Sequence, residues 1–390
     1  MAHFFNHLVT ALPIPLLPLI RDEFNLSNTQ AGLVVSAFTL SMGLAQLPAG
    51  ILTDRIGPRR IIGFSILGIG ISGLLVGLTH SYLLMLIFLI LMGVFGGGYH
   101  PAAPPLLAAT VPPNNIGKAF GFHLVGGNAA FFLAPLIGAW IATVWGWRAG
   151  FVGLAVPTII FGIAFFFIIS RIIMRKTQSV PQSPTPDTTT EPTQRPQGWK
   201  KQIVLFLLLA ALISSLSMST ISFLSLFMVD HFGITAVAAA IFIAINNSTG
   251  LWASPIGGYL SDRIGHVPSL LISCLAAGPI IFLMTVTPYG AGFVIILLLW
   301  GALNSIRMPA TESFIMKHGS QKTRSTLLGI YYFASGHGSG ILAPVLGYLI
   351  DQFGYSISLY IVAIAMLSAT LIIGLFLWTI QNKSTSAVST

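Results

Sequence analysis

The chain consists of long apolar runs separated by short breaks that are charged or rich in glycine and proline. A helix needs about 20 apolar residues to cross the roughly 30 Å hydrocarbon core of a bilayer. The alternating stretches of about ten residues that form outer-membrane barrels are lacking. The pattern therefore predicts an all-α membrane protein whose twelve transmembrane helices lie near residues 4–20, 31–52, 61–79, 82–109, 118–143, 149–170, 202–228, 236–260, 267–286, 291–316, 326–350 and 356–380.

A charged fragment occurs twice, each time at the end of a long apolar run. Residues 50–60 read GILTDRIGPRR, and residues 258–266 read GYLSDRIGH, 208 positions later. This period is far too long for a solenoid unit and indicates two six-helix bundles related by internal pseudo-symmetry. We expect an N-terminal half at residues 1–176 and a C-terminal half at 199–390. Residues 177–198 contain five prolines and nothing to bury, so they predict a disordered cytoplasmic linker.

Composition indicates that lipid is the solvent of this chain. Hydrophobic residues make up 55% of the 390 positions and charged residues 7%, with a mean hydropathy of +0.88. The chain lacks the polar surface that a water-soluble globule of this size needs. The single Cys274 excludes an internal disulfide. Zinc-ligand spacings, nucleotide-binding loops and hydrolase motifs are lacking, so we expect neither an enzyme nor an ATP-driven pump, and no cofactor or metal.

The net charge of +9 is explained by membrane topology. Lysine and arginine in short loops are retained on the cytoplasmic side. With both termini inside, fifteen of the eighteen basic residues fall on that side, Arg21 and Arg148 fall outside, and Arg307 lies within a helix. We therefore expect a multi-pass, monomeric protein of a prokaryotic plasma membrane with both termini in the cytoplasm. Nucleic acid is not an expected partner, because it would require a basic face on a soluble module.

The repeated loop has the form Gly-x-Leu-x-Asp-Arg-x-Gly-x-Arg-Arg, and its second copy keeps only the first part. Together with the six-plus-six layout, this loop resembles the major facilitator superfamily over the whole chain. Three shorter stretches are similar to the fosmidomycin-resistance branch of that superfamily: His3-Phe-Phe-Asn6-His7, Tyr99-His100-Pro101, and Gly126-Gly127-Asn128-Ala129 followed by Ala134-Pro135. The resemblance implies a secondary transporter that exports a drug-like molecule or small metabolite and uses the proton gradient as its energy source.

The chain also departs from that pattern. His7 and Ala102 stand where the branch commonly carries acidic residues, so the proton-handling roles of those carboxylates do not carry over. Ile90 and Met92 occupy the arginine and glutamine positions of the helix 4 motif of drug–proton antiporters. These departures weaken the case for antiport and leave the expected fold untouched.

In the superfamily, the repeated loop is understood to hold the two halves together on the cytoplasmic side. A carboxylate at a helix end can pair with cations or with the positive N-terminus of a neighbouring helix. The alternative is an ordinary group of interfacial charges that anchors the topology. The resemblance implies a conformational latch formed by Asp54, Arg55, Gly57, Arg59, Arg60, Asp262 and Arg263.

Two charges lie inside one apolar run, at 291–316: Arg307 and Glu312. A charge at a helix centre in the membrane costs about 2.5–3.5 kcal/mol and usually faces a partner or an internal cavity. Arg307 is a permanent cation suited to an anionic substrate group or a carboxylate, whereas Glu312 can gain and lose a proton. Positions five apart differ by about 140° on an ideal helix, so Glu312 shares the Arg307 face only if Pro309 kinks the segment, whereas Asn304 and Thr311 share it directly. Structural partners, namely carbonyls for Arg307 and a loop cation for Glu312, are the alternatives.

Other candidates for substrate binding or proton coupling lie in the remaining apolar runs. Tyr99 and His100 of helix 4 correspond to Arg307 and Met308 of helix 10, and Pro101 permits a kink that lines a cavity. A histidine can carry a proton near neutral pH, or it can serve as a hydrogen-bonded structural group. The further candidates, for which capping or close helix packing is the alternative, are Asn6, His7, His123, Asn128 and His337.

These features predict a secondary active transporter in which residues 1–176 rock against residues 199–390 around a midplane cavity formed mainly by helices 1, 4, 7 and 10. Proton-coupled efflux of a small molecule is the leading interpretation. Proton-coupled uptake of an organic anion held by Arg307 is the alternative within transport. A sensor or assembly protein on a transporter scaffold is the alternative outside transport, and the polar groups kept in helices 4 and 10 argue against it.

Overall fold

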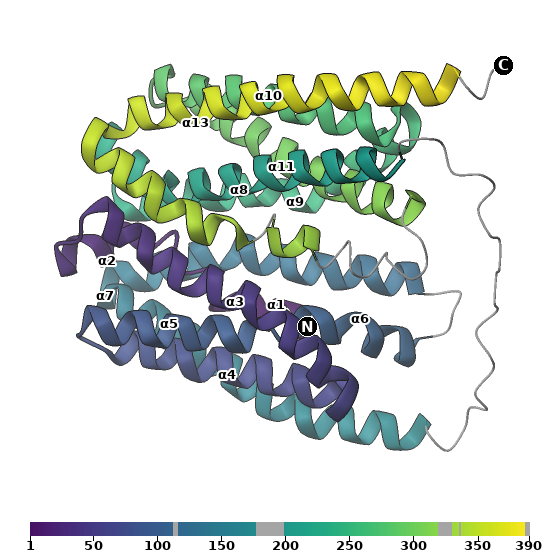
Figure 1. Ribbon diagram of the computed structural model, residues 1–390. Helices are drawn as coiled ribbons and strands as arrows, with labels where there is room; N and C mark the ends of the chain where they lie inside the picture. Colours follow the sequence, from purple (N-terminus) through teal and green to yellow (C-terminus); the bar gives the residue numbers. More distant parts are fainter. Residues whose placement is uncertain (112–115, 177–198, 319–329, 335–336, 387–390) are drawn as a thin grey trace.

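The computed structural model describes residues 1–111, 116–176, 199–318, 330–334 and 337–386, and within these residues the chain forms helices and no β-strand. The predicted linker at 177–198 lies outside the described residues. Figure 1 shows the purple-to-blue helices of the N-terminal half below the green-to-yellow helices of the C-terminal half. The helices are α1 (Ala2–Leu8), α2 (Leu17–Phe24), α3 (Asn28–Ile56), α4 (Pro58–Leu78), α5 (Tyr82–Gly96), α6 (Tyr99–Thr110), α7 (Ile116–Lys176), α8 (Trp199–Phe232), α9 (Ala236–Ile264), α10 (His266–Val286), α11 (Ala291–His318) and α13 (Ser339–Ser386).

Nine helical stretches within the described part of the chain are long and apolar enough to cross a membrane. Two helices bend sharply, since α7 contains Gly146 at φ 81° and α13 contains Gly354 at φ 75°. Each bend falls in the break between two predicted transmembrane segments. The prediction of an all-α membrane protein is confirmed, and the number of twelve spans stays a prediction.

Two of the predicted transmembrane helices are broken. The run at 4–20 forms α1 and α2 with turns between them, and α1 ends at its C-cap Val9. The ring of Pro13 would clash with the carbonyl four residues earlier, which is that of Val9, and this ends the helix. The run at 82–109 is interrupted between α5 and α6, so that a new helix begins at Tyr99. Both breaks bring polar side chains and helix ends into the interior of the N-terminal half.

The two copies of the repeated fragment have the same local structure. Gly57 follows α3 at φ 90°, and Gly265 follows α9 at φ 95°. Side chains other than glycine rarely adopt these angles, which explains why the fragment has glycine at this position. Each glycine is also the N-cap of the next helix, α4 or α10. The sequence repeat is therefore a repeated helix–glycine–helix corner.

The halves contact each other chiefly through two pairs of helices, α3 with α13 and α7 with α9. Glycines allow the backbones of the first pair to approach closely. A Cβ atom on Gly32 would lie 2.7 Å from the carbonyl oxygen of Ala343, and one on Gly347 would lie 2.3 Å from that of Asn28. Close approach at small residues is a common mode of helix packing in membranes. The contact between α3 and α13 thus depends on the absence of side chains at these positions.

Candidate functional site

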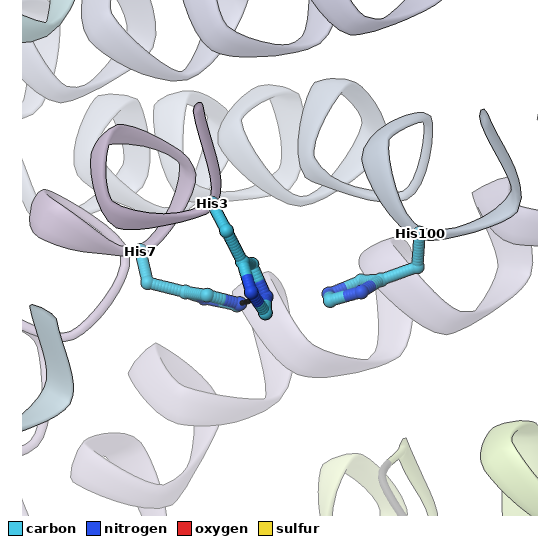
Figure 2. Close-up of side chains that lie close together, drawn as sticks. All are labelled: His3, His7 and His100. Atoms are coloured by element: carbon cyan, nitrogen blue, oxygen red, sulfur yellow. Dashed lines mark hydrogen bonds between the residues drawn. The ribbon is translucent and has the colours of Figure 1, made fainter. Parts of the chain in front are cut away.

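A cluster of histidine and tyrosine side chains lies inside the N-terminal half. His3 and His7 are one turn apart on α1 and share a face, Tyr99 and His100 begin α6, and His123 lies on α7. The His3 ring stacks on the His123 ring at a centroid distance of 4.2 Å and on the Tyr99 ring at 5.4 Å. Figure 2 shows His3, His7 and His100 pointing toward one another, and one nitrogen of each lies within 4.8 Å of the others.

Hydrogen bonds orient the histidines. The Nδ1 atom of His3 lies 2.8 Å from the carbonyl oxygen of His123. A carbonyl oxygen only accepts, so His3 donates through Nδ1 and its Nε2 atom carries a lone pair. The Nε2 atoms of His3 and His7 are 3.1 Å apart, and the hydroxyl of Thr10 lies 3.4 Å from Nδ1 of His7. His3, which the sequence analysis did not select as a site residue, is thus at the centre of the cluster; its spacing from His7 was the available signal.

Asn6 is another buried polar residue of α1. It is fully buried, and neither atom of its side-chain amide has a hydrogen-bond partner among the described residues. An unpaired buried polar group costs about 1–3 kcal/mol, and native proteins rarely keep one without a water or ligand to bind. Its spacing of three residues makes Asn6 a neighbour of His3 on α1, whereas adjacent positions such as Asn6 and His7 do not face each other on a helix. The amide is therefore a second polar group that α1 can offer to a ligand, beside the histidines.

Arg307 organises a second polar group, in the C-terminal half. The residue lies within α11 (Ala291–His318) and is 4% exposed. Nε donates to the hydroxyl of Ser214 at 3.2 Å and Nη2 donates to Oδ1 of Asn304 at 2.6 Å, whereas Nη1 has no partner among the described residues. Thr311 donates to the backbone carbonyl of Arg307 at 3.0 Å. The hydrogen-bond partners are neutral, so the guanidinium retains a donor for an anionic or carbonyl oxygen.

Glu312 lies outside the Arg307 group. Its carboxylate accepts a hydrogen bond of 2.8 Å from the hydroxyl of Tyr332. Within the described residues it forms no ion pair with a loop lysine or arginine. Arg307 and Glu312 therefore have separate partners, as expected from their spacing on the helix, and their roles in binding and coupling stay predictions.

Asn128 and His337 lie between the halves. Nδ2 of Asn128 donates to the carbonyl oxygen of Gly250 at 3.0 Å, and Nε2 of His337 lies 3.0 Å from Nε2 of Gln46. The imidazole of His337 also packs on the backbone of α3, where a Cβ atom on Gly43 would lie 2.4 Å from the ring. These two candidates therefore contribute directly to the contact between the halves.

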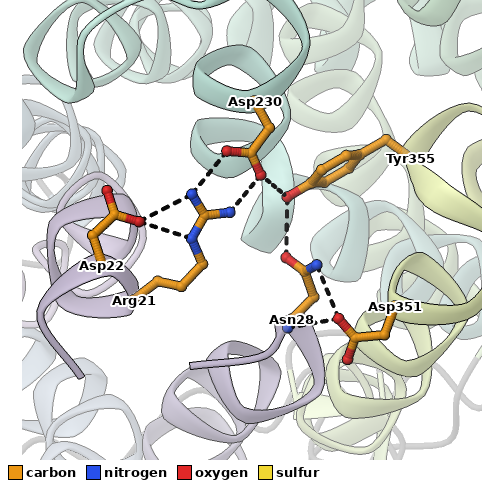
Figure 3. Close-up of polar contacts among 6 residues, drawn as sticks. All are labelled: Arg21, Asp22, Asn28, Asp230, Asp351 and Tyr355. Carbon is orange, nitrogen blue, oxygen red and sulfur yellow. Dashed lines mark hydrogen bonds and ion pairs between the residues drawn. The ribbon is translucent and has the colours of Figure 1, made fainter. Parts of the chain in front are cut away.

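Charged side chains also join the halves, at the end of the molecule that holds α2. Figure 3 shows Arg21 of α2 facing Asp230 of α8. The guanidinium donates to both carboxylate oxygens, and its Nη2 atom lies 2.8 Å from Oδ1. The hydroxyl of Tyr355 lies 2.8 Å from the same carboxylate. By the predicted orientation this is the extracellular end, and the sequence contains no signal that pairs these distant residues.

Asp351 connects the halves at the same end by capping a helix of the other half (Figure 3). One carboxylate oxygen accepts from the backbone nitrogen and side-chain nitrogen of Asn28, at 2.8 and 3.0 Å. The other accepts from the backbone nitrogen and hydroxyl of Thr29, at 2.8 and 2.6 Å. These residues begin α3, where backbone N–H groups have no partner within the helix and the helix dipole is positive. The carboxylate therefore satisfies the start of α3 only while this end is closed.

Glu23, near the same end, forms its contacts within the N-terminal half. Its carboxylate accepts hydrogen bonds from the indole nitrogen of Trp147, at 2.6 Å, and from the guanidinium of Arg148. Partial burial acts to raise the pKa of Glu23, but the hydrogen bonds from Arg148 and Trp147 hold it below its usual value. These contacts fix α2 to the bend in α7.

The repeated loops lie at the opposite end of the molecule. Within the described residues, Asp54 and Asp262 have neither a hydrogen bond nor an ion pair. Arg59 donates to the carbonyl oxygen of Phe166 at 2.9 Å, which is a contact within the N-terminal half. Arg263 lies 3.4 Å from the hydroxyl of the tyrosine one turn earlier in α9. None of these contacts crosses between the halves, so they do not test the expected latch, which stays a prediction.

Comparison with known proteins assigns the chain to a protein family. The sequence model of the Major Facilitator Superfamily matches residues 1–288 and 207–388. The multidrug resistance protein MdtG of Dickeya zeae (strain Ech586) is 27% identical over 382 residues, which cover 94% of this chain and 90% of the relative. MdtG of Escherichia coli O17:K52:H18 is 28% identical over 332 residues, covering 82% of this chain and 78% of the relative.

Solved structures share the fold at low sequence identity. A bacterial homologue of the human lysosomal transporter Spinster superposes with a TM-score of 0.78 at 18% identity, covering 97% of this chain and 95% of the other. A D-xylose–proton symporter superposes with a TM-score of 0.76 at 15% identity, covering 95% and 94%. These likenesses agree with the all-helical architecture. The chain belongs to the major facilitator superfamily and is a multi-pass membrane transporter of small molecules, not an enzyme.

Proposed function

We propose that the protein exports small drug-like or metabolite molecules by alternating access, coupled to proton entry. The observation that carries the alternating-access part of the proposal is the unequal contact between the halves: Arg21 and Asp351 join them at one end, whereas Asp54 and Asp262 at the other end make no contact across them among the described residues. Alternating access requires a state in which one end is closed. The charge bias of the loops supports an extracellular position for the closed end and a cytoplasmic position for both termini.

Polar groups in both halves support a substrate contact from each side. Asn6 contributes an amide in the N-terminal half and Arg307 contributes an N–H in the C-terminal half, and neither has a hydrogen-bond partner among the described residues. A ligand shifts a conformational equilibrium only through contacts that differ between the two states. A substrate held by groups from both halves meets this requirement. The MdtG relatives, which are called multidrug resistance proteins, support a drug-like substrate.

Proton coupling requires side chains that change charge as the halves move. Glu312, bonded to Tyr332, is our first candidate, because His7 and Ala102 replace the acidic residues common in the fosmidomycin-resistance branch. A conformational change that alters the burial or hydrogen bonding of a carboxylate alters its affinity for a proton. The histidine cluster is the second candidate, since imidazoles exchange protons near neutral pH.

The proposal is tested in proteoliposomes that contain a pH-sensitive dye and carry an imposed proton gradient. The substrate panel comprises phosphonates, organic acids, sugars and hydrophobic cations. Export requires that substrate and protons move in opposite directions, and Glu312→Gln should abolish the proton movement. Asp22→Asn is the matched control, because Asp22 is an exposed carboxylate whose one polar partner within the described residues is Arg21 of its own helix. Substrate flux without proton flux would contradict the coupling.

Arg307 favours a second candidate function, proton-coupled uptake of an organic anion. Its buried guanidinium has no carboxylate partner within the described residues, so an anionic substrate would supply the missing charge. The same assay separates the two functions, because uptake requires that substrate and protons move together. Movement restricted to organic acids and phosphonates would identify the anion as the recognised group.

A further inference from the structure

The histidine cluster brings several imidazole nitrogens close together, and hydrogen bonds among the described residues do not occupy all of them. His3, His7 and His100 each present one ring nitrogen within 4.8 Å of the other two (Figure 2). His100 contacts the other rings but forms no hydrogen bond through its side chain among the described residues. The amide of Asn6, one turn from His3 on α1, also has no hydrogen-bond partner among the described residues. We propose that His3, His7 and His100 form a binding site for one divalent transition-metal ion.

The distances suit such an ion. A zinc–imidazole bond of about 2.0–2.1 Å in a tetrahedral site places two ligand nitrogens about 3.4 Å apart. The Nε2 atoms of His3 and His7 are already 3.1 Å apart. The limit of 4.8 Å for the whole group exceeds the tetrahedral edge by about 1.4 Å. A shift of about 1.4 Å in the ring of His100 would close that difference, and no side-chain hydrogen bond of His100 among the described residues opposes such a shift.

The surroundings of the histidines also suit a metal site. His3 donates through Nδ1 to the carbonyl oxygen of His123, which leaves the lone pair of Nε2 directed at His7. A hydrogen bond from the second ring nitrogen to a carbonyl is the usual way in which proteins orient a metal-binding histidine. Without an ion, a proton on His7 bridges the two Nε2 atoms; an ion would replace that proton and engage both lone pairs. The hydroxyl of Thr10, 3.4 Å from Nδ1 of His7, can orient the second ring.

The donor set indicates the class of metal. Three imidazoles without a thiolate or carboxylate suit zinc, nickel, cobalt or copper, whereas calcium and magnesium prefer oxygen ligands. Three protein ligands leave at least one coordination position for water or for a donor atom of a small molecule. All three histidines belong to the N-terminal half, so the site does not require a particular arrangement of the two halves. Metal binding can therefore be measured without transport and does not depend on the proposed export.

The test uses the purified full-length protein in detergent, with an affinity tag that contains no histidine and after removal of metals with a chelator. Titration with Co²⁺ should produce the visible absorption bands of a nitrogen-bound ion and saturate at one ion per chain. Zn²⁺ should displace the Co²⁺. His7→Gln and His100→Gln should each weaken Co²⁺ binding at least about tenfold. His80→Gln is the matched control, because His80 is an exposed histidine in the loop between α4 and α5, and it should bind as the parent does.

Two results would overturn the proposal. The first is a parent protein that gives no saturable Co²⁺ absorption, a measurement that involves no variant and no question of misfolding. The second is a loss of binding that is equal for His80→Gln and His100→Gln, because the ion would then bind surface histidines. Melting curves of all variants establish that those compared are folded. If His7→Gln is unfolded, His100→Gln still decides the question, since His100 makes no hydrogen bond through its side chain among the described residues.

Discussion

Replacement of Asp351 by alanine should release the closed end of the transporter. The carboxylate accepts four hydrogen bonds from the first two residues of α3, and all four cross between the halves. When this end opens, the donors and the carboxylate form hydrogen bonds with water instead, so only the net free energy of each bond stabilises the closed state. Asp351 is exposed, so each bond is assigned a value at the low end of the range, about 0.5 kcal/mol. The total is about 2 kcal/mol.

A change of this size has a large effect on the populations. Because 1.4 kcal/mol corresponds to a factor of ten, a loss of about 2 kcal/mol lowers the ratio of closed to open molecules about 30-fold. A closed state favoured by about 99 to 1 would fall to about 3 to 1. The variant would therefore populate both states visibly, where the parent populates one.

Electron paramagnetic resonance measures the distribution of distances between two spin labels, and this distribution reports the two populations. The single Cys274 is buried and can be replaced by serine, after which His80→Cys and Pro288→Cys place labels on exposed loops of the two halves at this end. Asp351→Ala should add a population with a longer distance between the labels. Asp22→Ala should not, because it removes a carboxylate whose polar contacts among the described residues stay within α2, and it leaves the bonds from Arg21 to Asp230 in place. A distance distribution unchanged by Asp351→Ala would refute the assignment of Asp351 as a closing contact.

Further predictions concern binding, packing, pH and the latch. Arg307→Ala should weaken substrate binding about 10- to 150-fold by removing hydrogen bonds from a charged donor, while the melting temperature shows that the fold is kept; an unchanged dissociation constant would contradict its role. Gly347→Ala places a Cβ atom 2.3 Å from a backbone carbonyl of α3 and should lengthen the spin-label distance, whereas Gly258→Ala, which meets no atom within 4 Å, should not. The hydrogen bonds to Glu23 hold its pKa below 4.5 despite partial burial, so their stabilisation is present above about pH 4.5 and is lost as the pH falls through the folded-state value. Glu23→Gln should therefore flatten the dependence of melting temperature on pH below 4.5, and a curve parallel to that of the parent would disprove this. Asp54→Asn should slow turnover and leave substrate affinity unchanged if the loop acts as a latch, and identical exchange kinetics would remove that role.

Much of the fold could be predicted from local properties of the chain. Apolar runs of sufficient length favour helices in lipid, because the bilayer leaves no alternative partner for backbone groups. The repeated fragment indicated an internal repeat, and the structure gives its two copies the same corner, at Gly57 and Gly265, since the same residues favour the same backbone angles. The placement of Asn304 on the Arg307 face followed from helical geometry alone, and their hydrogen bond of 2.6 Å agrees with it.

Other features depend on how distant segments pack. Asp351 and Asn28 are 323 positions apart, and nothing in either segment indicates that one caps the helix of the other. His337 lies against Gln46 between the halves, a contact that the sequence does not indicate, and its candidacy for substrate contact stays a prediction. The expectation that the chain has no metal site rested on ligand spacing along the sequence. The cluster that motivates our proposal joins α1 to α6, and only the fold brings those helices together.

The sequence by itself therefore determined the membrane environment, the helices and the internal repeat. The transfer of an apolar segment into lipid and the backbone angles at a glycine are properties of short stretches of chain. Only the tertiary structure decided which polar groups meet. His3, His7 and His100 come together, and Arg21 pairs with Asp230, through contacts between helices that are far apart in the chain. Those contacts depend on side-chain shape and on close approaches at small residues. These properties belong to pairs of surfaces, so no single segment contains them.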